Sequence, residues 1–239
     1  MNSTVDTSQE LRARLRQVRS RIESAAKRSN RSADEITLVA VSKTHPAEIV
    51  REAIASGVTD LGENRVQEAD EKIPEVGRGA AHWHLIGHLQ SNKARHAVQL
   101  FDVIHSLDSV ALARKLNRAC EELDHQELPV LIQVDLGHEP TKFGVDEEQL
   151  LNLVSAVKEC ERLRLNGLMT LPPFFDDPEV TRPYFVKLRE LRDRYRRAGA
   201  FGSGTGELSM GMTQDFEVAI EEGATLVRVG TAIFGERQK

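Results

Sequence analysis

The chain has 239 residues, of which 40% are hydrophobic and 29% charged, and its formal net charge at pH 7 is -5. This composition is typical of a soluble globular protein, and no apolar stretch reaches the roughly 18 residues that a membrane helix requires. The acidic balance argues against a general nucleic-acid-binding role. Because the N-terminus MNSTVDTSQE lacks the apolar segment of a secretory signal, we expect a cytoplasmic protein.

The first predicted element is an amphipathic helix. Residues 7–10 have the S/T-x-x-E form of a capping box, and apolar residues follow at spacings of three and four over residues 11–25. Arginines are distributed around this helix and are not interleaved with aromatic residues, which favours a solvated face. Further along the chain, Cys120 and Cys160 show no metal-ligand spacing, so we expect two reduced thiols in the core.

Short β-rich segments then alternate with helical patterns. Alternation of this kind requires parallel strands joined by crossovers, and eight repeats predict a single closed (β/α)8 TIM barrel. No linker divides residues 1–239, so we expect one domain, with the first helix in place of the missing eighth crossover helix. Helices are predicted at 47–56, 66–73, 109–123, 147–160, 181–197 and 215–222. The predicted strands are ITLVAVSK from Ile36, DLGEN from Asp60, HWHLIGH from His82, DVIHSL from Asp102, PVLIQVDL from Pro129, RLNGLMTL from Arg164, GELSMGM from Gly206 and LVRVGTAIFG from Leu226.

The predicted first strand ends on a lysine. In TIM barrels the functional residues lie at the C-terminal ends of the strands. By the period of two, Val39, Val41 and Lys43 share one face, and an inward orientation would place Lys43 at the mouth of the barrel. A lysine at a strand end is usually solvated, so this position alone decides nothing. Lys93 and Lys142, in loops after the predicted third and fifth strands, are the competing amines.

The ends of the predicted seventh and eighth strands are rich in small and hydroxyl-bearing residues. Barrels frequently bind phosphate at this place. Arg228 lies within the last strand, where an unpaired charge is costly, so a ligand or a carboxylate is expected beside it. A lysine opposite a phosphate site suggests a phosphorylated aldehyde held as an imine, and burial above the valines would favour the neutral amine. The candidate phosphate residues are Ser209, Gly211, Thr213, Gly230 and Thr231.

Five stretches together resemble the pyridoxal phosphate homeostasis protein family: AVSKTHP, GENRVQE, WHLIGHLQSNK, GLMTLPP and LSMGMTQDFEVAIEEGATLVRVGTAIFG. They extend over residues 40–235. The resemblance implies the alanine racemase-like barrel of PLP fold type III, with an extra N-terminal helix. It also implies pyridoxal 5'-phosphate (PLP) bound as a Schiff base to Lys43, with Asn64 beside the ring and Arg228 at the pyridine nitrogen. The implied phosphate contacts are Ser209, Gly230 and Thr231, with Met210 and Thr213 lining the site.

Two positions depart from the usual pattern of this family. His88 stands where a proline is common, and Asp135 stands where an asparagine is common, which adds a carboxylate near the mouth. The cofactor assignment is little affected by either change. Because the barrel mouth has no covering domain, our first hypothesis is a protein that buffers PLP and supplies it to PLP-dependent apo-enzymes. The sequence shows no obvious exposed apolar stripe, so we expect a monomer.

A PLP-dependent racemase, or a related amino-acid enzyme with weak activity, is the alternative function. A positive arginine beside the pyridine nitrogen disfavours ring protonation and therefore carbanion chemistry. A racemase also needs a second base on the face opposite the lysine. The tyrosines Tyr184 and Tyr195 fall in a predicted helix, where packing or surface roles are favoured. We therefore expect a carrier without substantial turnover.

The pattern H-x-H from His82 raises a third hypothesis, because two histidines on one strand face resemble the metal pair of some barrel hydrolases. His82 and His84 lie at the start of the predicted third strand, away from the mouth, so we expect packing or surface roles and no metal. His88 is nearer the mouth and stays open. Glu63 would pair with Arg228 or another cation, or be solvated, and Trp83 is expected in the core.

Overall fold

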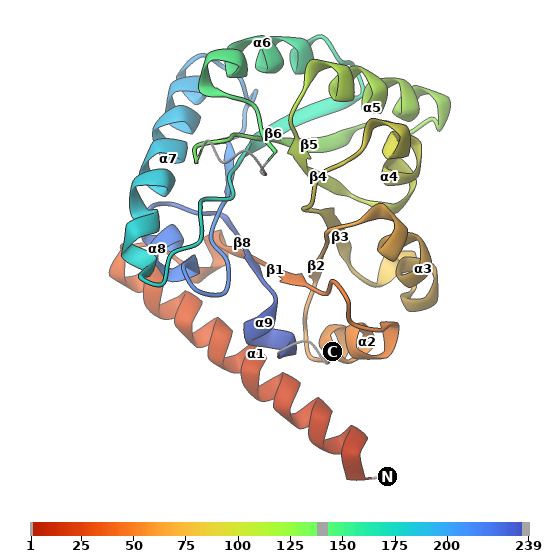
Figure 1. The fold of residues 1–239 in the computed structure, drawn as a ribbon, viewed down its shortest axis with the longest axis vertical. Helices are drawn as coiled ribbons and strands as arrows, with labels where there is room; N and C mark the ends of the chain where they lie inside the picture. Colours follow the sequence, from red (N-terminus) through yellow and green to blue (C-terminus); the bar gives the residue numbers. More distant parts are fainter. Residues whose placement is uncertain (1, 138–142, 236–239) are drawn as a thin grey trace.

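The computed structural model describes residues 2–137 and 143–235. In these residues eight parallel strands form a closed barrel in chain order, and the last strand pairs with the first (Figure 1). This arrangement confirms the predicted TIM barrel. The strands are β1 (Thr37–Val41), β2 (Asp60–Glu63), β3 (His82–Leu85), β4 (Val103–Leu107), β5 (Leu128–Gln133), β6 (Leu163–Met169), β7 (Glu207–Ser209) and β8 (Leu226–Val229).

Helices surround the strands, and most of them match the predicted ranges to within a few residues. Two segments differ from the prediction. Residues 94–100 form a short helix that was not predicted, and the segment expected to continue the last strand turns at Gly230 into a single helical turn. The helices are α1 (Asn2–Arg28), α2 (Ala47–Ala55), α3 (Val66–Val76), α4 (Ala94–Leu100), α5 (Val110–Glu122), α6 (Glu147–Lys158), α7 (Arg182–Arg197), α8 (Phe216–Glu221) and α9 (Thr231–Phe234).

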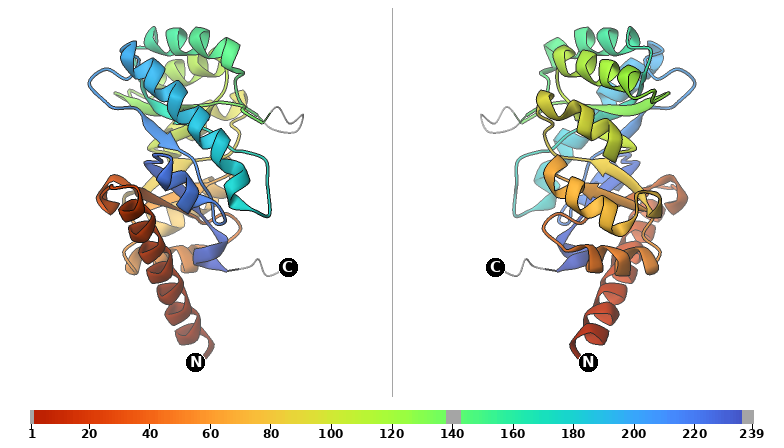
Figure 2. Two further views of the ribbon diagram at one scale, coloured as in Figure 1. Left: turned by 90° about the vertical axis from the view of Figure 1, so that its left-hand side faces the viewer. Right: turned by 90° about the vertical axis from the view of Figure 1, so that its right-hand side faces the viewer.

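Helix α1 packs on the outside of the closed barrel and contacts α8, α9 and α2. Its apolar stripe is buried from Leu11 to Ala25, and the helix packs on α8 and α9, so it takes the expected place of an eighth crossover helix. Ion pairs of Arg21 with Glu217 and of Arg28 with Glu221 join α1 to α8 at 3.0 and 2.7 Å. The N-terminal end of α1 extends beyond the barrel (Figure 2).

The capping box predicted at residues 7–10 is wrong, because α1 begins at Asn2 and these residues lie within the helix. The residues before them continue the helical backbone, so the chain has no turn there for a cap to close. A capping box is found at the short 3-10 helix that precedes β1. Its Ser32 side chain accepts from the Asp34 N–H, and Glu35 accepts from the Ser32 N–H at 2.9 Å.

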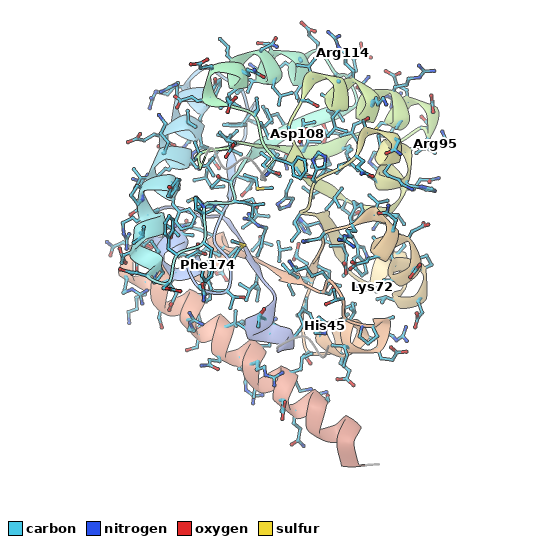
Figure 3. All side chains as sticks on the ribbon, in the orientation of Figure 1. His45, Lys72, Arg95, Asp108, Arg114 and Phe174 are labelled. Carbon is cyan, nitrogen blue, oxygen red and sulfur yellow. The ribbon has the colours of Figure 1, made fainter. Side chains whose placement is uncertain are left out.

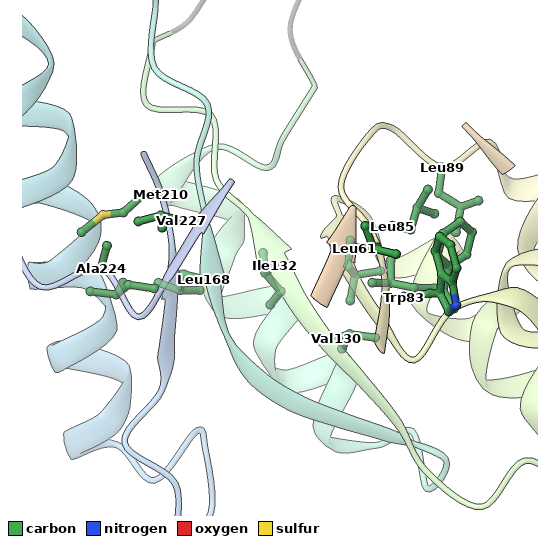
Figure 4. Packing of buried hydrophobic residues seen from close by; sticks show 14 of the residues in the cluster. Leu61, Trp83, Leu85, Leu89, Val130, Ile132, Leu168, Met210, Ala224 and Val227 are labelled. Atoms are coloured by element: carbon green, nitrogen blue, oxygen red, sulfur yellow. The ribbon is translucent and has the colours of Figure 1, made fainter. Parts of the chain in front are cut away.

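The side chains of each strand alternate between two buried layers. One set faces the helices and forms the main core, in which Leu61, Trp83, Ile132, Leu168 and Val227 are completely buried (Figure 4). Each such residue contributes about 1.5–3 kcal/mol through burial. The other set faces the inside of the barrel and includes the small cluster of Val39, Leu131, Met169 and Leu226. This alternation decides which residues reach the cavity described below.

Trp83 lies in the core, as predicted, and Cys120 and Cys160 are buried thiols. Among the described residues, no helix has both the length and the apolar character that crossing a bilayer demands. Helix α1 is long, but charged side chains recur along its whole length.

Candidate functional site

A cavity of about 700 Å³ lies at the C-terminal ends of the strands. Residues far apart in the sequence meet there because all eight strands are parallel and end at the same side of the barrel. Figure 3 shows two of its residues, His45 after β1 and Phe174 after β6, at different positions around the barrel. The predicted site residues that line this cavity are Lys43, Asn64, Thr213, Arg228, Gly230 and Thr231.

Lys43 lies in the turn directly after β1 and is half-buried in the cavity wall. Val41 lines the same cavity, and Val39 lies in the interior cluster, which confirms that the three residues share the inward face. The turn is tight, because Thr44 has a positive φ of 67° and the His45 N–H donates to the Ser42 carbonyl at 3.1 Å. The backbone that carries Lys43 is therefore fixed on both sides of it.

A buried ion pair holds the opposite face of the same turn. Ser42 points away from the cavity, and its hydroxyl donates to Glu63 Oε1 at 2.7 Å. Lys72 on α3 donates to the same carboxylate oxygen at 2.5 Å and to the Ser42 carbonyl at 2.8 Å. The Glu63 side chain is fully buried and that of Lys72 is 8% exposed. Figure 3 shows Lys72 on the α3 side of the barrel.

These contacts answer the question of the partner of Glu63. Its cation is Lys72, outside the mouth, and not Arg228. Burial raises the pKa of Glu63 above its ordinary value, although Lys72 and the Ser42 hydroxyl act in the opposite direction. Side chains alternate along a strand, and a Cβ on Gly62 would point into the barrel toward Val39. The next residue, Glu63, therefore faces the helices.

Arg228 forms the floor of the cavity and is 3% exposed. Its Nη2 donates to the Thr170 carbonyl at 2.9 Å and its Nη1 donates to Ser209 Oγ at 2.5 Å. Burial lowers its pKa to about 10, while the carboxylate of Asp215 acts to raise it. The guanidinium therefore stays charged at pH 7, and Asp215, which also lines the cavity, is the carboxylate that the sequence led us to expect nearby.

Ser209 and Met210 are not among the residues that line the cavity in the described part of the chain. Ser209 points into the barrel but lies below Arg228, and its hydroxyl is used by Arg228 and by His105 Nδ1 at 2.8 Å. Met210 is the next residue, so it faces the helices and is completely buried in the main core. Met210 therefore lies in the core and Ser209 lies beneath Arg228, whereas the family resemblance implies that both residues are near the cofactor.

Ser209 belongs to a continuous series of hydrogen-bonded side chains inside the barrel, which we call the polar row: Asp60, His84, His105, Ser209 and Arg228. Asp60 Oδ1 lies 3.0 Å from His84 Nε2, and His84 Nδ1 lies 2.9 Å from His105 Nε2. The row connects the cavity floor to the N-terminal ends of β2 and β3. His105 was not singled out from the sequence, because a lone histidine in a strand gives no such signal.

The groups at the two ends of the polar row, Arg228 and Asp60, indicate which atom carries each proton. Burial lowers the pKa of His105 well below its ordinary value, and the charge of Arg228 acts in the same direction, so His105 is neutral. Arg228 can only donate, so Ser209 Oγ accepts from it, and with the His105 proton on Nε2 the Ser209 hydroxyl donates to His105 Nδ1. His105 Nε2–H then donates to His84, and His84 Nε2–H donates to Asp60. Burial alone would raise the pKa of Asp60, but hydrogen bonds from His84 and Thr59 outweigh it and lower the pKa.

Aromatic residues surround the entrance to the cavity and were not predicted. Phe174 and Phe143 are 71% and 51% exposed, and both line the cavity. His88 stacks on the Phe143 ring with centroids 3.6 Å apart, and its Nδ1 lies 3.2 Å from Asp108 Oδ2. The unusual His88 is therefore part of the rim. The sequence signal for this rim is the run LPPFF after β6, which places two phenylalanines in a loop at the mouth.

The remaining predicted positions lie elsewhere. Asp135 follows β5 and accepts from the Gly137 N–H at 3.2 Å, and it is not among the described residues that line the cavity. Lys93 lies in a 3-10 helix, Ser91–Lys93, and Lys142 lies outside the described residues. On α7, Tyr195 is buried in the core. Tyr184 stacks on Phe175, which also lines the cavity, with ring centroids 6.2 Å apart.

Known proteins resemble this chain over nearly its whole length. Residues 11–238 match the family model of the alanine racemase N-terminal domain. A pyridoxal phosphate homeostasis protein of Aquifex aeolicus is 45% identical over 226 residues, which are 94% of this chain and 97% of that protein. The protein of the same name from Escherichia coli is 43% identical over 233 residues, covering 93% of this chain and 95% of that one.

A solved structure is also similar to this chain. The PipY protein of Synechococcus elongatus with PLP bound superimposes with a TM-score of 0.80 at 36% identity. The superposition covers 94% of this chain and 100% of that one.

Proposed function

The chain belongs to the alanine racemase N-terminal domain family and, within it, to the pyridoxal phosphate homeostasis proteins, and from this membership we propose that it binds PLP in the cavity and acts in PLP homeostasis. The observation that carries the proposal is that Lys43 and Arg228 line one cavity together with Thr213 and Thr231. An amine, a fixed cation and hydroxyl donors are the groups that an aldehyde, a pyridine ring and a phosphate require.

The donor set fits the cofactor residue by residue. Lys43 would hold PLP through an imine with its aldehyde, and Thr213, Gly230 and Thr231 would contact its phosphate. Arg228 cannot turn away from the cavity floor, because Ser209 and Thr170 hold both of its terminal nitrogens.

The same geometry favours storage of the cofactor over turnover. PLP supplies an electron sink in enzymes, and that sink is strongest when its pyridine nitrogen is protonated. Arg228 is charged at pH 7, so a second positive charge beside it is disfavoured. We propose that the protein buffers PLP and supplies it to apo-enzymes, with weak amino-acid racemisation as the alternative.

The first experiment tests the cofactor and its lysine. PLP is added to the purified protein, its visible absorption spectrum is recorded before and after borohydride reduction, and the modified lysine is mapped by peptide mass spectrometry. We expect label on Lys43 in the wild type and loss of the label in Lys43→Ala, while the matched variants Lys93→Ala and Lys142→Ala keep it. Label on Lys93 or Lys142 alone would contradict the Lys43 assignment, and absence of any spectral change would contradict PLP binding.

The second experiment separates storage from turnover. The PLP-loaded protein is incubated with single enantiomers of amino acids, and the products are separated by chiral chromatography. A carrier leaves the enantiomers unchanged and transfers PLP to an added apo-enzyme, whose activity then appears. Steady conversion of one enantiomer into the other would establish the racemase alternative instead.

A further inference from the structure

A second group of chemically reactive side chains lies at the opposite end of the barrel from the cavity. Asp60 and His82 are the first residues of β2 and β3, and the two are direct partners in the sheet. His84 follows two residues later, so its side chain is on the same face of β3 as that of His82. Trp83 between them faces the helices and is fully buried. The three polar side chains therefore converge on the N-terminal opening of the barrel.

The spacing of these groups suits a metal ion. One ligand atom from each of Asp60, His82 and His84 lies within 4.8 Å of the other two. The shortest separation is 3.0 Å, between Asp60 Oδ1 and His84 Nε2. In tetrahedral coordination with bonds of about 2.0–2.2 Å, two ligand atoms of zinc lie about 3.3 Å apart. Asp60 and His84 are thus nearly at ligand separation, and a ring nitrogen of the exposed His82 lies within 4.8 Å of both ligand atoms.

The groups behind these side chains hold them in orientation. A histidine that ligates a metal through one ring nitrogen usually donates a hydrogen bond from the other. His84 is arranged in this way, because its Nε2 points to Asp60 while its Nδ1 contacts the buried His105 at 2.9 Å. The second carboxylate oxygen of Asp60 accepts from the Thr59 hydroxyl at 2.6 Å. Two of the three side chains are thus oriented before any ion binds.

The neighbouring carboxylate is used in another way. Asp102 accepts two hydrogen bonds from Arg78, at 2.7 and 2.9 Å, and one from the Trp83 N–H. It is therefore held away from the group. Two histidines and one carboxylate remain, which is a ligand set of zinc sites that keep a position for water or an outside ligand.

We propose that Asp60, His82 and His84 bind a divalent transition metal ion, with zinc as the best match, at the end of the barrel opposite the cavity. This site is independent of the proposed function and contradicts our sequence-based expectation of no metal. Sequence spacing alone showed two histidines on one face. The structure adds a carboxylate from the neighbouring strand and a hydrogen-bonded partner behind His84.

Metal binding would also reverse the polar row. A metal ion on His84 Nε2 leaves the proton of that ring on Nδ1, which then donates to His105 Nε2. His105 must in turn carry its proton on Nδ1 and donate it to Ser209. The Ser209 hydroxyl would then accept from both His105 and Arg228, so the ion changes the hydrogen bonding directly below the cavity floor.

The proposal is tested with tag-free protein that has been freed of metal by chelation and dialysis. It is titrated with Zn²⁺ by calorimetry, and with Co²⁺ while the visible absorption of the cobalt is recorded. We expect one ion per chain. His82→Gln should weaken binding by at least about 100-fold, which is more than the loss caused by replacing a residue that only hydrogen-bonds to a metal ligand. His82 is exposed, so this variant should fold normally, and His96→Gln, which removes an exposed histidine of α4, is the matched control.

Two results would overturn the site: wild-type protein that takes up no stoichiometric Zn²⁺, or His82→Gln protein that binds it as tightly as His96→Gln. The reversal of the polar row is tested by ¹⁵N NMR of the histidine rings, which distinguishes a protonated Nδ1 from a protonated Nε2. We expect the His105 proton to move from Nε2 to Nδ1 when Zn²⁺ is added. A zinc-loaded protein with an unchanged His105 ring would refute the coupling.

Discussion

Replacing Lys72 with methionine tests whether the buried ion pair supports the turn that carries Lys43. Methionine is unbranched, keeps most of the length of the side chain and removes the charge, so Glu63 loses its cation and Ser42 loses the donor to its carbonyl. Because the Glu63 side chain is 0% exposed, its carboxylate would be left in the core with one hydroxyl donor. Breaking a buried pair from one side costs about 3–5 kcal/mol of unfolding free energy.

The loss should depend on pH in a defined direction. Burial already raises the pKa of Glu63, and removal of the cation raises it further. A carboxyl group whose pKa is raised on folding is favourable to the folded state when protonated, and this contribution is lost as the pH rises through the folded pKa. Lys72→Met should therefore be less destabilised at pH 5 than at pH 8.

The assay is urea unfolding followed by circular dichroism at both pH values, with two comparison proteins. The double variant Glu63→Gln/Lys72→Met removes the unpaired charge and should recover about 2 kcal/mol or more of the loss. Arg51→Met breaks an exposed ion pair with Glu75 and should cost about 0–1 kcal/mol. If Lys72→Met behaves like Arg51→Met, the ion pair contributes no more than a surface pair and the reasoning is refuted.

Three further predictions concern the polar row, the mouth and the thiols. Ser209→Ala removes the hydrogen-bond partner of Arg228 Nη1 and of His105 Nδ1 and should cost about 1–3 kcal/mol in urea unfolding. Ser106→Ala removes a buried hydroxyl that has no partner among the described residues and should be nearly neutral. Gly87→Ala places a Cβ 2.2 Å from the Asn64 carbonyl oxygen and should lower the melting temperature. Gly79→Ala has open space around it and should leave the melting temperature unchanged. Equal melting temperatures of the two variants would contradict this prediction. Burial raises the pKa of Cys120 to about 11, so only about one thiol in 1,000 is a thiolate at pH 8, and a thiol reagent should modify the folded protein far more slowly than the urea-unfolded one.

The barrel was predictable because its signal is repeated along the whole chain. Each of the eight apolar runs became a strand, and the lysine at the end of the first run lies at the mouth. Helix α4, which has seven residues, was missed. The last strand was predicted too long because TAIF is as apolar as the strand before it, and only the turn at Gly230 separates them.

The sequence predicted which residues at the strand ends face the cavity. It did not predict how far along the barrel axis a residue lies. The period of two predicts a face but not a height along the barrel axis, so Ser209 was expected at a phosphate and lies below Arg228. Met210 was implied by the family resemblance, although the same period places it against the helices. Contacts between strands that are distant in the sequence, such as that of His105 with Ser209, have no local pattern that would predict them.

The turn after β1 also constrains how this protein can evolve. Ser42 and Lys43 point to opposite sides of the barrel wall, one toward the Glu63 carboxylate and the other into the cavity. Insertion or deletion of one codon within β1 would exchange the two sides, sending the ammonium into the core and the hydroxyl to the mouth. The length of this strand should therefore be invariant among descendants that retain the cofactor, while loops at the rim are free to grow or shrink.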